Sequence, residues 1–341
     1  MSPDSLAVEV VALVATVAAA VMLGIVWGAG RSRSRILIRS AAVATCLATA
    51  AATGGIWVNR QVDTYPTWGS LLGSTSAAAA APATGSAGRI IGFTVAGRAS
   101  GMTMPVYAYL PPGYDSRPDT RFPVVEALHG YPGSPLQWIR RFGVAAVLDQ
   151  EISAGRMAPT VVLFPYQTPQ PLVDTECANL VGGPQAETFL TVDVPAAARA
   201  RLHLRPTGDG WGLIGFSAGG YCAADLALRH PGEYTAAASL SGYATPGIRI
   251  GNGTENTLYD DVWRLRHLPI PAVALYLSCA RADPAAMRST AQLAHAARPP
   301  LAVTTAFING GGHNTQTWLA MEAPAFDWLS TMLGRPVGGP V

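Results

Sequence analysis

Residues 211–231 read WGLIGFSAGGYCAADLALRHP: an apolar run, a glycine-rich turn and an Ala-rich segment. The turn, GFSAG at residues 215–219, fits the pattern GxSxG between a strand and a helix. Such a sharp turn exposes the serine hydroxyl on a strained backbone, and the flanking glycines prevent collisions with neighbouring elements. The pattern predicts Ser217 as a nucleophile. A glycine-rich turn with a phosphate-binding or structural role is the alternative.

A serine nucleophile needs a base, and six histidines are available. His313 lies in NGGGHNTQTW, between the last expected strand and the last expected helix, where hydrolases with the order Ser, acid, His place the base. The other histidines lie at element ends, within helices or in the turn that follows an early strand. We therefore predict His313 as the base, with a solvated loop histidine as the alternative.

The orienting acid is expected in the loop after the apolar run AVALYLS. That loop continues CARADP and supplies Asp283 directly before a helix. We predict Asp283 as the acid, although an aspartate at this place is also a typical helix N-cap. Asp261 ranks second, because it comes before this strand and not after it.

An oxyanion hole needs two backbone N–H groups, and we expect these from Ala218 and from Tyr131 in the loop LHGYPGSP. A simple Gly/Pro turn is the alternative for that loop. His129 and Trp138 flank it and are candidates for the substrate pocket. Trp138 could equally belong to the core.

Alternating strand and helix patterns from residue 89 to residue 341 predict one α/β domain with a mainly parallel central sheet flanked by helices. Strands are expected at 90–95, 104–110, 123–128, 160–164, 211–216, 235–240, 272–278 and 302–308. Helices are expected at 135–154, 186–203, 218–229, 284–297 and 315–333. Sites in such folds lie at the carboxyl ends of the strands.

Residues 1–60 predict a membrane anchor with two transmembrane helices, at about 6–28 and 36–58. Between them lies GRSRSR, and this basic loop predicts a cytoplasmic turn with both flanks facing outward. A cleaved signal peptide or a single-pass anchor is the alternative. Residues 61–88 are mostly small and uncharged and predict a linker. The catalytic domain is therefore expected outside the cytoplasm.

The composition is 49% hydrophobic and 13% charged, with a net charge of +2, so nucleic-acid binding has no electrostatic support. Four cysteines lack the spacing of a metal site, and neither a metal nor an organic cofactor is expected. In an oxidising compartment, Cys177 and Cys222 are the preferred disulfide pair. The alternative is that the three cysteines after Cys46 are buried free thiols.

The catalytic domain resembles the esterase D family of α/β-hydrolases, which includes S-formylglutathione hydrolases, feruloyl esterases and secreted mycolyltransferases. The resemblance is carried by YLPPGYDSRPDTRFPVVEALHGYPGS at 109–134, by GFSAGGYCAADLALRHPGEYTAAASLSG at 215–242 and by GGHNTQTW at 311–318. It implies the α/β-hydrolase fold and the same catalytic and oxyanion residues. Mycolyltransferases have Asp-Gly and a basic residue at the oxyanion loop, where this chain has HGYP, so transfer to trehalose is not expected. The two N-terminal spans and the lysine-free sequence look more like membrane-tethered actinobacterial esterases.

These residues predict a membrane-anchored serine esterase that acts on lipid or cell-envelope esters through an acyl-enzyme. One alternative is an acyltransferase of the mycolyltransferase type, with a sugar or glycerol acceptor. A second alternative is a non-catalytic envelope scaffold that keeps the fold.

Overall fold

The computed structural model describes residues 3, 5–28, 32–62, 65, 68–71, 87–170 and 172–338. The chain divides into two compact units, Met1–Ser76 and Ala77–Val341. Most of the predicted linker at 61–88 lies outside the described residues.

The first unit is an antiparallel pair of long helices followed by a short one: α1 (Leu6–Val26), α2 (Ser32–Val62) and α3 (Trp68–Leu71). The Thr16 and Thr53 hydroxyls lie 2.8 Å apart, and Arg60 Nη1 donates to Glu9 Oε2 at 2.6 Å. Residues of α1 thus contact residues of α2 in antiparallel order, and the two helices form a hairpin. The Arg60 partner of Glu9 is a feature that the sequence pattern did not predict.

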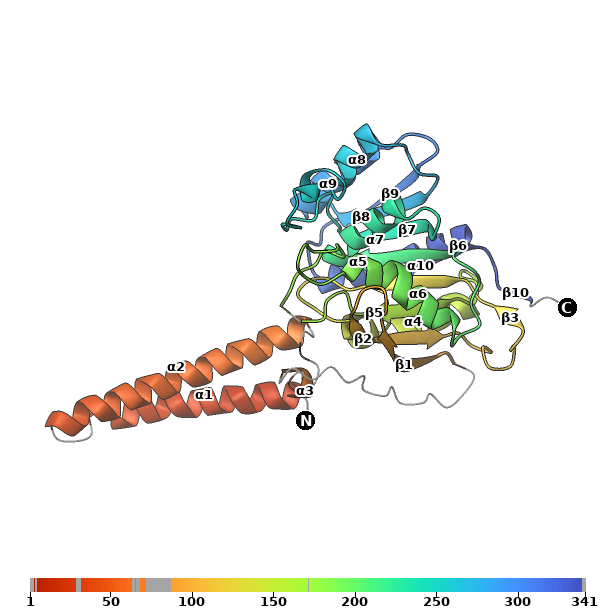
Figure 1. The fold of residues 1–341 in the computed structure, drawn as a ribbon. Coiled ribbons are helices and arrows are strands. Elements are labelled where there is room, and N and C mark those ends of the chain that lie inside the picture. The colour runs from red at the N-terminus through yellow and green to blue at the C-terminus, as the bar shows by residue number, and fades with distance from the viewer. Residues whose placement is uncertain are drawn as a thin grey trace. The chain divides into compact units, whose positions relative to one another are not determined.

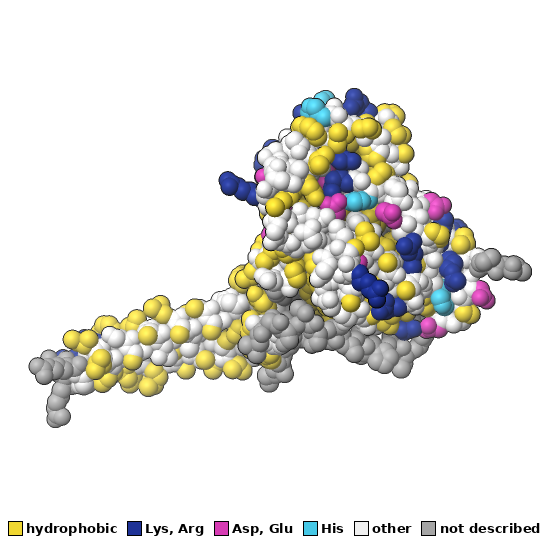
Figure 2. Space-filling model, in the orientation of Figure 1, with side chains coloured by type: hydrophobic (Ala, Val, Ile, Leu, Met, Phe, Trp, Pro, Cys, Tyr) yellow, Lys and Arg dark blue, Asp and Glu magenta, His cyan; other side chains and the backbone are white. Residues whose placement is uncertain are grey.

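Apolar side chains cover the outside of these two helices rather than an interior (Figure 2). The apolar 18-residue window within Leu6–Val26 has a mean hydropathy of 2.5, and the one within Ser34–Arg60 has a mean hydropathy of 1.6. Both helices are long and apolar enough to cross a bilayer. They are candidates for membrane spans on length and composition.

The second unit is built on an eight-stranded sheet in the order β1-β2-β5-β4-β6-β7-β8-β9 (Figure 1). Its strands are β1 (Arg89–Ala96), β2 (Thr103–Leu110), β4 (Val124–Leu128), β5 (Val161–Pro165), β6 (Gly208–Phe216), β7 (Tyr234–Leu240), β8 (Ala274–Ala280) and β9 (Ala302–Ile308). Only the β1–β2 and β2–β5 pairings are antiparallel, so the prediction of a mainly parallel sheet is confirmed. A separate ribbon pairs β3 (Thr120–Arg121) with β10 (Val337–Gly338).

Helices cover both faces of the sheet. One buried cluster joins strand residues to helical segments that follow β5, β6, β7 and β8. The other joins alternate strand residues to the helical segments that follow β4 and β9. The helical segments of the second unit are η1 (Gln137–Arg141), α4 (Val144–Ser153), α5 (Ala186–Thr188), η2 (Phe189–Asp193), α6 (Val194–Arg199), α7 (Ala218–Arg229), η3 (Thr254–Asn256), α8 (Asp261–His267), α9 (Pro284–Ala296) and α10 (Thr315–Leu333).

Two predicted helices are interrupted. The one predicted at 135–154 is a π-helical turn, η1, and then α4, because Gly143 between them has a φ of 64° and ends the first segment. The one predicted at 186–203 passes through the π-helical turn η2 and ends at Arg199. Helix α8 and the β3–β10 ribbon were not predicted.

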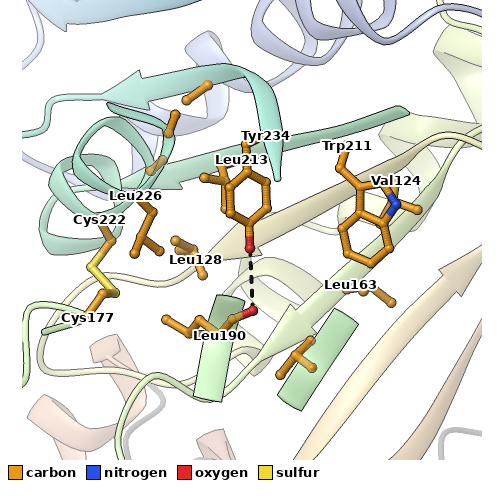
Figure 3. Close-up of a cluster of buried hydrophobic side chains, with 14 of the residues drawn as sticks. Val124, Leu128, Leu163, Cys177, Leu190, Trp211, Leu213, Cys222, Leu226 and Tyr234 are labelled. Carbon is orange, nitrogen blue, oxygen red and sulfur yellow. Dashed lines mark hydrogen bonds between the residues drawn. A yellow bond between two sulfur atoms is a disulfide. The ribbon is translucent and has the colours of Figure 1, made fainter. Parts of the chain in front are cut away.

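The core on the α7 side of the sheet contains aliphatic strand residues such as Leu128 and Leu213 together with Leu226 of α7 (Figure 3). At the edge of this cluster, a disulfide joins Cys177, in the loop after β5, to Cys222 of α7. The loop is therefore covalently tied to the helix that begins at Ser217.

Candidate active site

Ser217 lies at the turn from β6 into α7 with φ 56° and ψ −122°, a backbone conformation that side chains rarely adopt. The turn is possible only because of its glycines. A Cβ on Gly215 would lie 1.9 Å from the carbonyl oxygen of Gly219, and a Cβ on Gly219 would lie 2.3 Å from that of Leu128. These short contacts explain why both glycine positions of the GxSxG pattern exclude a side chain.

Three side chains from the carboxyl edge of the sheet form a continuous hydrogen-bonded relay. Ser217 Oγ lies 2.8 Å from His313 Nε2, and His313 Nδ1 lies 2.7 Å from Asp283 Oδ2. Asp283 is buried, whereas His313 keeps a face open to solvent. With its proton on Nδ1, the imidazole donates to Asp283 and presents the Nε2 lone pair to the serine hydroxyl.

Asp283 fulfils both roles that the sequence left open. Its Oδ1 accepts the N–H of Ala286 at 3.1 Å and caps α9, while its Oδ2 accepts from His313. The alternative acid, Asp261, is the first residue of α8 and makes no hydrogen bond to His313.

The loop that carries His313 is fixed by its own backbone and side chains. Gly310 and Gly311 have φ values of 75° and 73°, which permit the reversal after β9. Thr317 Oγ1 accepts the N–H of Gly312 at 3.0 Å, and the edge of the Trp318 ring system packs against the imidazole at a centroid distance of 5.1 Å. The histidine therefore has a defined position relative to Ser217.

The predicted oxyanion residues lie on either side of the nucleophile. Ala218 is the first residue of α7, so its N–H is among those that a helix leaves without an internal acceptor. A Cβ on Gly130 would lie 3.4 Å from Ser217 Cβ, which places the loop containing Tyr131 directly beside the serine. The Tyr131 hydroxyl donates to the carbonyl oxygen of Leu172 at 2.9 Å.

Gln167 clamps the oxyanion loop and was not predicted. Its Oε1 accepts the N–H of His129 at 2.6 Å, and its Nε2 donates to the His129 carbonyl oxygen at 3.1 Å. The same amide nitrogen lies 3.5 Å from Cys177 Sγ and 3.7 Å from Cys222 Sγ. The disulfide, Gln167 and the oxyanion loop thus form one packed assembly.

The two candidate pocket residues are interior. Trp138 is 0% exposed and donates through Nε1 to the Leu128 carbonyl oxygen at 3.1 Å, so its assignment to the acyl pocket is corrected to a core residue. His129 is 2% exposed, which likewise corrects its assignment as a pocket residue. Burial lowers the pKa of His129 to about 4, so its ring is neutral near pH 7.

Tyr243, in the loop after β7, is a further residue that the sequence analysis missed. Its hydroxyl oxygen lies 3.1 Å from His313 Nε2, and its ring stacks on the imidazole with a centroid distance of 5.6 Å. Burial raises the pKa of this phenol. The motif SLSG directly before Tyr243 was recognised, but nothing in it indicated that the next side chain turns toward the histidine.

Among the described residues, no three His, Cys, Asp or Glu side chains gather as a metal site would require. The chemistry of the arrangement is that of an activated hydroxyl with a base and an orienting carboxylate.

Residues 97–326 match the model of the Esterase family, described as "Putative esterase". This chain belongs to that family. The esterase is 24% identical over 252 residues to an uncharacterized protein of Corynebacterium glutamicum, a match that covers 68% of the chain and 58% of that relative. The chain thus spans less than two thirds of the length of this relative. It is also 35% identical over 65 residues to the diacylglycerol acyltransferase/mycolyltransferase Ag85A of Mycobacterium tuberculosis, 19% of each chain.

Solved structures support the same fold. A ferulic acid esterase superposes with a TM-score of 0.63 at 15% identity, over 73% of this chain and all of its own. An S-formylglutathione hydrolase from Agrobacterium tumefaciens superposes with a TM-score of 0.61 at 14% identity, over 74% of this chain and 99% of its own. The resemblance to the esterase D family and the α/β-hydrolase fold are therefore confirmed.

Proposed function

We propose that this esterase is a membrane-anchored serine hydrolase that cleaves carboxylic esters of lipids or of the cell envelope. The observation that carries the proposal is the Ser217–His313–Asp283 relay at the carboxyl edge of the sheet. Family membership supports the reaction class.

In the acylation step, Ser217 Oγ attacks the ester carbonyl carbon while His313 Nε2 takes the hydroxyl proton. Asp283 holds the imidazole in the required orientation and stabilises the imidazolium that forms. The carbonyl oxygen gains negative charge, which the N–H groups of Ala218 and Tyr131 would stabilise. The imidazolium then returns its proton to the departing alcohol, which leaves Ser217 acylated.

In the deacylation step, a water molecule takes the place of the alcohol. His313 Nε2 removes its proton as the water oxygen attacks the acyl carbon, and the same proton then returns to Ser217 Oγ. The products are a carboxylic acid and the free enzyme.

Two observations support an anchored catalytic unit outside the cytoplasm. Two helices meet the length and hydropathy of bilayer spans, and a basic segment, residues 30–35, lies where the second helix begins. In addition, Cys177 and Cys222 form a disulfide, which persists mainly in oxidising compartments. The test is to fuse, after residue 88, a reporter enzyme that works only in the cytoplasm. Activity of that fusion would contradict this topology.

The local similarity to the Ag85A acyltransferase/mycolyltransferase favours a second candidate, transfer of the acyl group to an alcohol. An alcohol would replace water in the deacylation step, and the relay would act unchanged. Product analysis with added glycerol or sugar separates the two candidates, because only a transferase forms new ester at the expense of free acid.

The test uses the full-length protein in detergent. We expect a fluorophosphonate probe to label the wild type at Ser217 and p-nitrophenyl butyrate to be hydrolysed. Ser217→Ala should abolish both signals, and His313→Ala should lower both by several orders of magnitude. A folded wild-type protein that neither takes the label nor hydrolyses the ester would refute the proposal and favour the scaffold reading.

A further inference from the structure

A groove of about 410 Å³ lies next to the relay, in the second unit. It is lined by the loop that holds Asp174 and Glu176, by the loop that begins at Tyr243, and by the first turns of α9 with Arg288. Tyr243 belongs both to the groove and to the relay, since its hydroxyl contacts His313. The groove is therefore continuous with the site of reaction.

The two carboxyl groups of this groove form no ion pair with any residue that the structure describes. Glu176 is 8% exposed, and its Oε2 has no hydrogen-bond partner among the described residues. Asp174 accepts the N–H of Glu176 at 3.1 Å and no other hydrogen bond from the described residues. Within the described part of the chain neither forms an ion pair, and Arg288 lines the same groove without reaching them.

Burial and the neighbouring Asp174 raise the pKa of Glu176 well above its usual range. Isolated buried carboxylates are costly, and the cost is removed by a positive charge at short range. Glu176 is held in place by backbone as well, because it and Cys177 have φ values of 41° and 55° and Cys177 is bonded to α7. The chain thus keeps a carboxyl group at a position that nothing in the described structure compensates.

Tyr243 connects the groove to the side of His313 Nε2 at which a departing alcohol oxygen would lie. His313 Nε2 gives its proton to the departing alcohol oxygen, so that oxygen must come within hydrogen-bonding distance of Nε2. The Tyr243 hydroxyl already occupies such a position, 3.1 Å from Nε2. The oxyanion loop approaches Ser217 through Gly130 instead.

We propose that this groove binds the alcohol portion of an ester that carries an ammonium group, with Asp174 and Glu176 as its counter-charges. The inference rests on the proposed esterase function and adds the class of substrate. A neutral polyol could accept and donate hydrogen bonds here, but it would leave two adjacent carboxyl groups without opposite charge. A cationic alcohol satisfies both.

The test compares butyrylcholine with 3,3-dimethylbutyl butyrate, using full-length esterase in detergent. The two esters share the acyl group and differ only in the charge of an isosteric alcohol. The quaternary nitrogen of choline, unlike a primary amine, cannot itself be acylated. We expect wild-type kcat/KM to be roughly tenfold or more higher for butyrylcholine. In Glu176→Gln and in Asp174→Asn this ratio should fall by about tenfold, mainly through KM. Glu255→Gln removes a carboxylate from a neighbouring groove and should leave the ratio unchanged.

Equal kcat/KM values for the two esters in the wild type would overturn the assignment, as would an unaltered ratio in both groove variants. A preference for glycerol monobutyrate over butyrylcholine would also overturn it, in favour of a polyol site. In each of these cases hydrolysis of p-nitrophenyl butyrate would continue and the proposed function would stand. Loss of all hydrolysis together with absent labelling of Ser217 would instead remove the esterase function and, with it, this inference.

Discussion

Glu322 offers a quantitative prediction about stability. This residue of α10 is 1% exposed, and neither carboxyl oxygen has a hydrogen-bond partner among the described residues. Burial raises its pKa from 4.5 to about 8. Because the folded-state pKa lies above the unfolded one, the stabilising contribution of the neutral form is complete below about pH 4.5 and is lost as the pH rises toward 8. At about 1.4 kcal/mol per pKa unit, the loss between about pH 5 and pH 7.5 is about 3 kcal/mol.

Glu322→Gln has nearly the same shape and no ionisation, so it should escape this loss. The stability difference between variant and wild type should shift by about 3 kcal/mol in favour of the variant between about pH 5 and pH 7.5, or roughly 6–12 °C in Tm for a unit of this size. Tryptophan fluorescence during thermal unfolding of the full-length protein measures it at both pH values. Asp119→Asn, at an exposed carboxylate, is the matched control. A pH-independent difference between Glu322→Gln and wild type would refute the reasoning.

Three further predictions concern the site. Asp283→Asn keeps an N-cap for α9 but places an N–H donor against His313 Nδ1. The kcat for p-nitrophenyl butyrate should therefore fall by roughly 10⁴ at unchanged Tm. A fall of less than tenfold would contradict the role of Asp283 in the relay. Gly219→Ala should abolish activity because its Cβ would meet the Leu128 carbonyl oxygen at 2.3 Å, whereas Gly232→Ala, with nothing within 4 Å, should retain it. Reduction of the Cys177–Cys222 disulfide should lower the free energy of unfolding by about 2–4 kcal/mol in denaturant titrations, and equal midpoints with and without dithiothreitol would show that the bond is dispensable.

The features that the sequence predicted well are those encoded locally. The strand and helix on either side of Ser217 begin and end close to their predicted residues, because the steric demands of the turn select glycine at fixed offsets. Asp283 and His313 follow from the same logic. Each lies in the loop after a strand of a parallel sheet, so their meeting is set by topology and not by any contact between neighbours in sequence.

Local pattern reading failed where the backbone departs from regular geometry without changing the hydrophobic pattern. The apolar periodicity across residues 135–154 fits a single helix, yet Gly143 breaks it after a π-helical turn. Trp138 lies in that turn, next to the predicted oxyanion loop in sequence. Its proximity in sequence suggested a pocket wall, but packing against Phe142 and Phe216 takes it into the core.

Three residues of the site that the sequence motifs did not predict come from segments distant in sequence. Gln167 and Glu176 come from the loop after β5, and Tyr243 comes from the loop after β7. None of the three belongs to a motif, because the tertiary fold, and not a neighbour in sequence, brings each of them to the site. The disulfide supplies the physical link, because it fixes the β5 loop against the nucleophile helix and thereby positions Gln167 under the oxyanion loop and Glu176 beside the relay. The local sequence of the turns therefore predicts the type of reaction, whereas the proposed selection of substrate depends on a loop whose position is set by long-range contacts.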